Sequence, residues 1–101
     1  MKTELRQPYR TFFGTLANQC RLDIIEALKD APMNVTQISK ITKMNQSTTS
    51  HNLQRLQTCG FVFAERRGKE KIYELNKDTI KPLLLLMKTH MKNYCEHHLI
   101  D

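Results

Sequence analysis

The most informative segment of the chain runs Asn45-Gln-Ser-Thr-Thr-Ser-His-Asn-Leu-Gln-Arg-Leu-Gln-Thr-Cys-Gly60, and Phe61-Val-Phe-Ala-Glu-Arg-Arg-Gly-Lys-Glu-Lys-Ile-Tyr-Glu-Leu75 follows it directly. The first part predicts a helix over about 46–58, because Asn45 is a good N-cap and Gly60 can adopt the left-handed conformation just past the last turn. The second part has two β-rich runs on either side of a basic turn over 66–71, which predicts a hairpin over about 61–75. A short helix therefore leads into a basic hairpin.

One face of the predicted helix bears only small or flexible hydrogen-bonding side chains. At helical spacing, Leu53 and Leu56 fall on one side together with Thr49. The opposite side has no carboxylate, whereas a helix that only faces solvent usually has Glu and Lys there. Contact with base edges in the major groove of DNA requires a face of this kind. From this helix and the turn before it, we expect DNA contacts from Lys43, Gln46, Ser47, Thr48, Ser50, His51, Gln54 and Arg55.

The hairpin turn over 66–71 holds four cations, one anion and a glycine. Such a charge run is usually an ordinary solvated turn. Beside a helix with a polar, acid-free face, contact with DNA phosphates is the favoured interpretation. The hairpin residues expected to make these contacts are Arg66, Arg67, Lys69 and Lys71.

Composition agrees with a small basic domain. A chain of 101 residues has room for one domain with one modest core, here taken as 1–101. Sixteen basic and 10 acidic residues leave a net charge of +6 and a pI near 9.4, which suits a polyanion, although a basic protein that is simply soluble has the same balance. The longest apolar run, Leu83–Met87, is far shorter than the roughly 20 residues of a membrane-spanning helix. No signal peptide is evident, so we expect a cytoplasmic protein.

Three helices are predicted before the central segment. The first spans about 8–16, with Pro8 in its first turn, where a proline is well tolerated. A second begins after Asn18, and Asn34 with Gln37 three residues later resembles the capping box of a short third helix. With the hairpin and a final helix, the chain is expected to be mainly α, in the order helix, helix, helix, helix, hairpin, helix. The apolar stripes are Tyr9, Phe12, Phe13 and Leu16, then Leu22, Ile25 and Leu28, then Val35, Ile38 and Ile41.

The final helix, predicted over about 79–98, has more apolar residues than one face of a surface helix needs. One face can pack on its own domain, but the second has no partner left in so short a chain, so we expect a homodimer built on this helix. The alternative is a broad helix sunk in its own core. A twofold dimer would also bring two helices to DNA half-sites about one helical turn apart. The expected interface residues are Tyr9, Phe12, Phe13, Ile80, Leu83, Leu84, Met87, Met91 and Tyr94.

Three segments resemble the ArsR/SmtB, or arsenic-repressor-like, family of winged helix-turn-helix transcriptional regulators. They are Leu16-Ala-Asn-Gln-Cys-Arg-Leu-Asp-Ile-Ile25, Gln46-Ser-Thr-Thr-Ser-His-Asn-Leu53 and the hairpin with Arg67-Gly68 and Ile72-Tyr-Glu-Leu75, and the resemblance spans nearly the whole chain. It implies a homodimer joined through the first and last helices, with recognition residues at Ser47, Ser50 and His51. It also implies repression that is relieved by an inducer, usually a metal ion or a thiol-reactive species.

The sensor motifs of this family are not intact here. Its thiolate metal site uses a Cys-x-Cys pair where this chain has Asn34 and Thr36, and its persulfide sensors place a cysteine where Glu26 stands. At the positions of the family's zinc site on the last helix, an ungapped register gives Lys77, Thr79, His90 and Asn93. Of these four residues only His90 is of a type that binds zinc, and it cannot supply the three or four ligands that a tetrahedral zinc site needs.

A cluster of possible metal or thiol ligands remains near the end of the chain. Cys95, His97 and His98, together with His90, could hold a soft or borderline metal ion, although so loose a motif often arises by accident. His90 is interpreted first as an interface or core histidine. Cys20 and Cys59 are interpreted as packing residues beside helix ends, since free cysteines of cytosolic proteins are usually buried and inert.

Enzymatic activity is not expected. The chain shows no nucleophile with an adjacent base, no glycine-rich phosphate loop and no carboxylate pair placed for acid–base chemistry. The main alternative from another class is a winged helix that serves as a protein–protein adaptor without specific DNA binding, because a fold alone does not decide function. Such an adaptor needs neither an acid-free helix face nor a cationic hairpin, so the sequence favours DNA.

Overall fold

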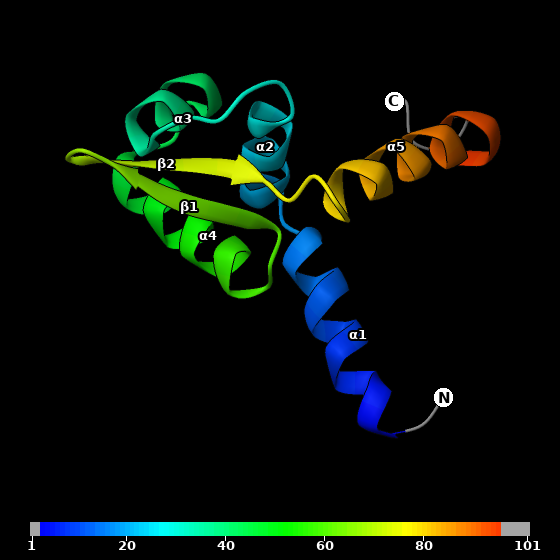
Figure 1. Ribbon diagram of the computed structural model, residues 1–101. Helices are drawn as coiled ribbons and strands as arrows, with labels where there is room; N and C mark the ends of the chain where they lie inside the picture. Colours follow the sequence, from blue (N-terminus) through cyan, green and yellow to red (C-terminus); the bar gives the residue numbers. More distant parts are fainter. Residues whose placement is uncertain (1–2, 96–101) are drawn as a thin grey trace.

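The computed structural model describes residues 3–95, with side chains from residue 7 onward. Four helices come first, a two-stranded antiparallel hairpin follows, and one more helix ends the described chain (Figure 1). This order confirms the predicted mainly α fold with a hairpin wing. The elements are α1 (Thr3–Leu16), α2 (Gln19–Leu28), α3 (Val35–Thr42), α4 (Gln46–Thr58), β1 (Val62–Arg67), β2 (Glu70–Leu75), α5 (Ile80–His90) and the π-helical turn η1 (Met91–Cys95).

The core lies where α2, α3, α4 and the hairpin meet. Ile24, Ile38, Leu53, Leu56 and Val62 are all completely shielded from solvent, and they come from each of these parts. Burial of an apolar side chain of this size stabilises the folded state by about 1.5–3 kcal/mol. The shared core therefore holds α4 in place relative to the hairpin.

Asparagine caps begin the three central helices, as the sequence predicts. The Oδ1 atoms of Asn18 and Asn45 accept hydrogen bonds from the N–H three residues later, at 3.0 and 2.7 Å. Asn34 and Gln37 form the reciprocal capping box, with bonds of 2.8 and 2.9 Å. A cap of this kind typically contributes about 1 kcal/mol, and each one satisfies a backbone donor that the helix itself cannot.

Two left-handed residues frame α4. Lys43 ends α3 with φ 59°, a conformation that is uncommon for a residue with a Cβ, and it makes the connection from α3 to α4 short. Gly60 follows α4 with φ 74°, as predicted, and turns the chain into β1. The α3–turn–α4 unit is thus a helix-turn-helix whose second helix has sharply defined ends.

The strands of the hairpin are longer and its turn is tighter than predicted. Arg66 pairs with Lys71 and Arg67 with Glu70, so four of the six residues assigned to a loop belong to the strands. Only two residues lie between the strands, and Gly68 supplies the positive φ of 64° that such a turn needs. The prediction of a loop over 66–71 was wrong, because charged residues can also form strands where these extend beyond the core and face solvent on both sides.

The hairpin is also tied to the segment between α2 and α3. Met33 and Tyr73 exchange two backbone hydrogen bonds, of 3.0 and 2.8 Å, in an isolated antiparallel bridge. Nearer the tip, Asn34 Nδ2 donates to Glu70 Oε1 at 2.8 Å. The edge of β2 is therefore attached, from its middle to its tip, to the short loop that leads into α3.

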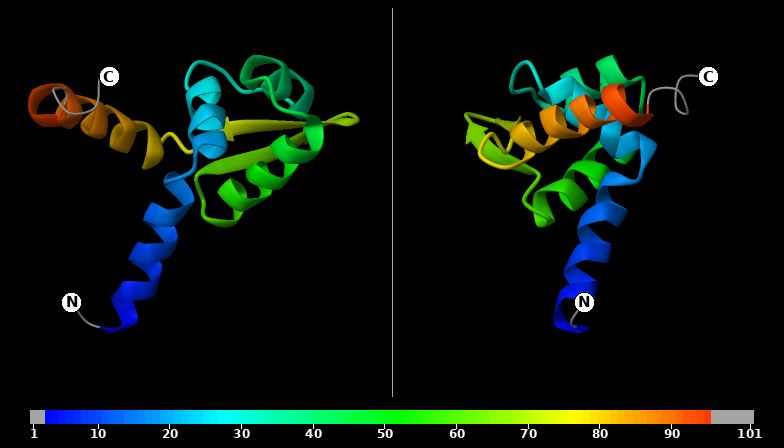
Figure 2. Two further views of the ribbon diagram at one scale, coloured as in Figure 1. Left: turned by 180° about the vertical axis from the view of Figure 1, so that it is seen from behind. Right: turned by 90° about the vertical axis from the view of Figure 1, so that its right-hand side faces the viewer.

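Helices α1 and α5 project from the core in different directions (Figures 1 and 2). The predicted start of α1 at Pro8 was wrong, because the helix begins at Thr3 and Pro8 lies inside it. Proline removes one backbone hydrogen bond at this point, and the helix continues across it. None of the helices within residues 3–95 is long and apolar enough to cross a membrane.

Three residues of the α2 and α3 stripes are less buried than predicted, and one of them is the half-buried Val35. Ile41 is 56% exposed, because it lines an open groove with Ala27 and Met33 between α2 and α3. In α2, Leu22 is only half-buried, and Ile24 takes a central place in the core beside Ile25. Helix α2 is packed on more than one side, so its buried surface is broader than a single stripe.

Candidate nucleic-acid interface

The inner side of α4 is completely buried in the core. Thr49, Leu53 and Leu56 have no solvent exposure, as the helical spacing predicts. The hydroxyl groups of Ser39 and Thr49 are hydrogen-bonded at 2.9 Å, which satisfies two buried polar groups between α3 and α4. A helix anchored in this way keeps its outer side in a defined direction.

The outer side of α4 presents the recognition face, which we define as Ser47, Ser50, His51 and Gln54. All four side chains are exposed. Gln46 is exposed beside them and donates from Nε2 to Thr36 Oγ1 at 3.1 Å, so it also spans the step between α3 and α4. The face offers donors and acceptors without a carboxylate, as base contact in a major groove requires.

Thr48 and Arg55, also expected to contact DNA, flank His51 at helical spacing, one turn before and one turn after it. Arg55 is exposed, but its Nε lies 3.4 Å from Thr15 Oγ1 at the end of α1. Thr48 is half-buried, and its carbonyl accepts a hydrogen bond from Asn52 Nδ2 at 3.0 Å. The structure therefore places Arg55 close to the end of α1, and Thr48 is the less accessible of the two residues. Lys43 is exposed in the turn before α4.

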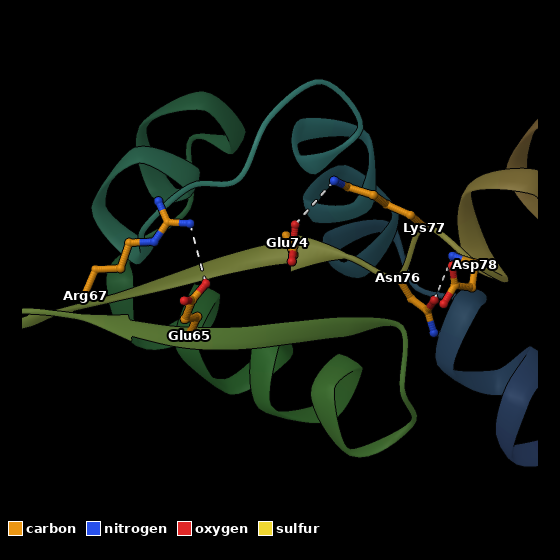
Figure 3. A network of polar contacts seen from close by, with 6 residues as sticks. All are labelled: Glu65, Arg67, Glu74, Asn76, Lys77 and Asp78. Carbon is orange, nitrogen blue, oxygen red and sulfur yellow. Dashed lines mark hydrogen bonds and ion pairs between the residues drawn. The ribbon is translucent and has the colours of Figure 1, made fainter.

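The wing presents exposed cations that are weakly paired. Arg66, Arg67, Lys69 and Lys71 are all exposed, and Arg67 Nη2 lies 3.5 Å from Glu65 Oε2 on the same strand (Figure 3). Both side chains of that pair are about two-thirds exposed, at 64% and 69%, so the pair contributes about 0–1 kcal/mol and can open readily. These side chains are free to contact phosphates.

The base of the wing leads into α5 through a small polar cluster. Lys77 Nζ lies 3.8 Å from Glu74 Oε2, and Asn76 Oδ1 accepts a hydrogen bond from the backbone N of Asp78 at 3.1 Å (Figure 3). Asn76 Nδ2 donates to the Gly60 carbonyl at 2.9 Å. Asn76 therefore links the end of β2 to the end of α4, a contact that no sequence pattern indicated.

Large apolar side chains remain exposed along α1, α5 and η1. Tyr9 is 47% and Phe13 60% exposed, and Leu85, Leu86 and Tyr94 are each 67–70% exposed. Leu85 and Leu86 were missed as interface candidates, although the run of four leucines could have indicated them. These side chains face solvent in the single chain, and burying them requires another surface.

The other predicted interface residues divide between core and surface. Ile80 is 3% exposed and belongs to the core of its own chain, so its assignment to an interface was wrong. Phe12 stacks on Phe61 with ring centroids 5.0 Å apart, which anchors α1. Leu83, Leu84 and Met87 are partly buried, and Met91 is 40% exposed.

The proposed sensor cluster is only partly described. His97 and His98 lie outside the described residues. Within residues 3–95, no group of three or more His, Cys, Asp or Glu side chains is placed to hold a metal ion. Cys95 is half-buried, and His90 is exposed, with its ring 5.1 Å from that of Tyr94. His90 is therefore not a core residue of its own chain.

Of the two other cysteines, Cys59 fits the packing interpretation. Cys20 and Cys59 are both free thiols of intermediate burial. Cys59 packs against the core, and its Sγ lies 3.3 Å from Thr15 Oγ1. It therefore helps to join the end of α4 to the end of α1.

Known proteins with similar sequences are transcriptional regulators. The family model described as "Bacterial regulatory protein, arsR family" matches residues 18–63. The arsenical resistance operon repressor of Bacillus subtilis is 31% identical, over 82% of this chain and 80% of the relative. The regulator NmtR of Mycobacterium tuberculosis is 35% identical over 68% of this chain, and the chain spans 58% of NmtR's length.

A solved structure of a related protein has the same fold. It is the winged helix-turn-helix DNA-binding domain Mb0332 from Mycobacterium bovis, described as homodimeric and as a possible ArsR-family regulator. Its TM-score to this chain is 0.84 at 31% identity, over 97% of this chain and 91% of the other. These relatives are regulators and not enzymes. From its sequence, its winged helix-turn-helix and its relatives together, the chain belongs to the arsR family of bacterial regulatory proteins.

Proposed function

We propose that the chain is a homodimeric, sequence-specific transcriptional repressor that places α4 in the major groove of operator DNA and the wing on the backbone. The observation that carries this proposal is the recognition face of Ser47, Ser50, His51 and Gln54, exposed on a helix that the core holds from behind. Gln46, Lys43 and the wing cations would add flanking contacts. The net charge of +6 supplies the attraction to a polyanion.

The dimer is supported by the exposed apolar side chains of α1 and α5. The related domain Mb0332 is described as homodimeric, and its fold matches over nearly the whole of this chain. In this proposal 79–98 is the dimerisation helix of a single domain over 1–101. A twofold axis near α5 would present two copies of α4 to half-sites about one helical turn apart.

The adaptor alternative accounts for less of the surface. A protein–protein adaptor could use the exposed leucines of α5, but it has no need for an acid-free recognition face or for four exposed cations on the wing. We further infer a cytoplasmic location, where DNA is accessible. An inducer would be a metal ion or a thiol-reactive species, with Cys95 and His90 the candidate ligands among the described residues.

The test is a gel shift with the full chain and duplexes that cover the region upstream of its own coding sequence. We expect one fragment to bind in the presence of excess random DNA. Its binding should weaken steeply as salt is raised, because contacts to phosphates release counterions from the DNA and added salt opposes this release. Lack of binding to every fragment at low salt, or an affinity that does not change with salt, would refute the repressor proposal.

The inducer question uses the same fragment. Adding zinc, arsenite or an oxidant should release the DNA if the C-terminal cluster is a sensor, and Cys95→Ser should abolish the response, because the thiolate is the reactive species. In reducing, metal-free buffer the variant should bind as the parent does. A response that survives in Cys95→Ser would assign the sensor to another site.

A further inference from the structure

The side chain of Arg21 in α2 joins the end of α1 to the middle of α4. Its Nε donates to the Thr15 carbonyl at 2.6 Å, and its Nη2 donates to the Gly14 carbonyl at 3.3 Å. Its Nη1 donates to Asn52 Oδ1 at 3.2 Å. Because a guanidinium is planar and its donors have fixed directions, these three bonds constrain the relative position of two helices.

At the α1 end of this link, Arg21 pairs carbonyl groups that the helix cannot pair by itself. The last carbonyls of a helix have no partners within it. Just past α1, backbone N–H groups donate to the carbonyls of Phe13 and Leu16 at 2.9 and 2.8 Å, which leaves those of Gly14 and Thr15 to Arg21. The positive charge also suits the negative end of the helix dipole. Arg21 therefore acts as the C-terminal cap of a helix to which it does not belong.

The α4 end of the link is a buried amide. Asn52 is 7% exposed, and while its Oδ1 accepts from Arg21, its Nδ2 donates to the Thr48 carbonyl. Asn52 directly follows His51 of the recognition face. A rotation of α4 about its axis would break the bond to Arg21 and leave a buried polar group unsatisfied, which is unfavourable. The bond thus ties the direction of the recognition face to α1.

We propose that Arg21 is a positioning residue that holds the recognition face at a fixed orientation relative to α1, and so sets the half-site spacing that the dimer accepts. This inference rests on the proposed function, because it takes α1 to lie in the dimer interface and α4 to contact bases. In a twofold dimer, the orientation of α4 relative to the interface helices determines where the two recognition helices lie. Arg21 influences DNA selection without touching DNA.

The attachment of α1 does not depend on Arg21 alone. Leu16 is 5% exposed within the core, and Phe12 stacks on Phe61. The Thr15 hydroxyl lies 3.3 Å from Cys59 Sγ. Changing Arg21 should therefore loosen the orientation of α1 against α4 without detaching the helix.

The test compares the wild-type chain with Arg21→Lys. Lysine keeps the charge but has a single flexible ammonium group, which cannot reproduce the fork between two helices. Hydrogen exchange of the full chain without DNA should be faster in the variant at the end of α1 and around Asn52. The exposed Arg10 of α1 provides the matched control, and Arg10→Lys should leave exchange unchanged.

The functional readout is the tolerance of half-site spacing. The probe is a duplex that the wild-type chain selects from a randomised library, together with versions whose central spacer is one base pair longer or shorter. Wild type and Arg10→Lys should lose about tenfold or more in affinity on the altered spacers, and Arg21→Lys less than about threefold, with affinity for random DNA changed less than about twofold in all three. Asn52→Leu, which removes the acceptor, should reproduce the Arg21→Lys pattern.

The outcomes separate the two proposals. If folded Arg21→Lys and Asn52→Leu discriminate between spacers as the wild type does, the positioning role is wrong although DNA binding stands. If Arg21→Lys does not fold, Asn52→Leu decides alone. If the wild type selects no duplex, the proposed function fails. The hydrogen-exchange measurement then still tests whether Arg21 links α1 to α4, and unchanged exchange in both variants would refute that link.

Discussion

Helices α4 and α5 differ in which side chains their own chain covers. On α4, the apolar residues Leu53 and Leu56 are completely buried, and the solvent side is polar. On α5, Ile80 is buried, but Leu85 and Leu86 are 67% and 68% exposed. The apolar side chains of α4 are covered within a single chain, whereas those of α5 are covered only in part.

This difference indicates what each helix can contact. The exposed side of α4 is stable in water and offers hydrogen-bonding groups, so a nucleic acid can replace the solvent there. The exposed side of α5 gains free energy only when another apolar surface removes it from water, and a second copy of the chain is the partner that the proposal assigns. The proposed function thus assigns base recognition to α4 and dimerisation mainly to α5, and substitutions on each helix should have distinct effects.

Leu86→Asp should have the largest effect. At this exposed position the aspartate leaves the core of the single chain intact, but it places an unpaired charge in the proposed dimer interface, at a cost of several kcal/mol if the interface is dry. Sedimentation should show a monomer where the wild type is a dimer. The exposed Thr36 in the first turn of α3, away from the apolar side chains of α1 and α5, provides a control in Thr36→Asp, which should remain a dimer. A Leu86→Asp dimer of normal stability would place the interface elsewhere.

Leu53→Ala tests the buried side of α4. Removing a completely buried leucine side chain should lower the free energy of unfolding by about 2–5 kcal/mol, because the cavity is only partly filled by relaxation. On the opposite side of the same helix, Gln54→Ala should change it by less than about 0.5 kcal/mol. Urea denaturation at equal protein concentration measures both. Similar losses for the two variants would contradict the assignment of the two sides.

Ser50→Ala and His51→Ala test the recognition face. Each should reduce the preference for the selected duplex over random DNA by about 1–3 kcal/mol, the usual contribution of a good base contact. On the wing, Lys69→Ala should weaken binding to both DNAs equally and lower the salt slope by about one. Competition gel shifts at several salt concentrations distinguish them. Equal losses on both DNAs for Ser50→Ala would mean that the face does not contact bases.

The smallest difference is expected at the helix starts. Asn45→Ala removes the bond from Oδ1 to the backbone of α4 and should lower the free energy of unfolding by about 1 kcal/mol. Thr79 precedes α5 and makes no capping bond with its side chain, so Thr79→Ala should change it by less than about 0.5 kcal/mol. Thermal unfolding of the two variants measures the contrast. A larger loss for Thr79→Ala would reverse the ranking of the two starts.

Local signals predicted most of the central unit correctly. The ends of α4, its asparagine cap, the left-handed Gly60 and the capping box at Asn34 all depend on residues within one or two turns of each other. The errors arose where a local rule had two outcomes. Pro8 fits the first turn of a helix but is tolerated inside α1, and the charged segment 66–71 fits a loop but forms paired strands around a two-residue turn.

Other features depend on contacts between distant residues. Arg55 Nε lies 3.4 Å from Thr15 Oγ1, and Arg21 spans from the carbonyls of α1 to Asn52. The sequence showed Arg21 only as one residue of a segment shared with the family, without a partner. Such links join residues far apart in the chain, and nothing in their spacing indicates them.

The sequence by itself determined the order of elements, the acid-free polar face of α4, the cationic wing and the excess of apolar residues on α5. Periodicity, capping and charge are local properties, and they persist whatever the chain packs against. Only the tertiary structure decided that Ile80 belongs to the core while Leu85 and Leu86 stay exposed, and that Arg21 connects α1 to α4. Burial and hydrogen-bond partners are properties of the packed chain, because they depend on which helices meet and at what angle.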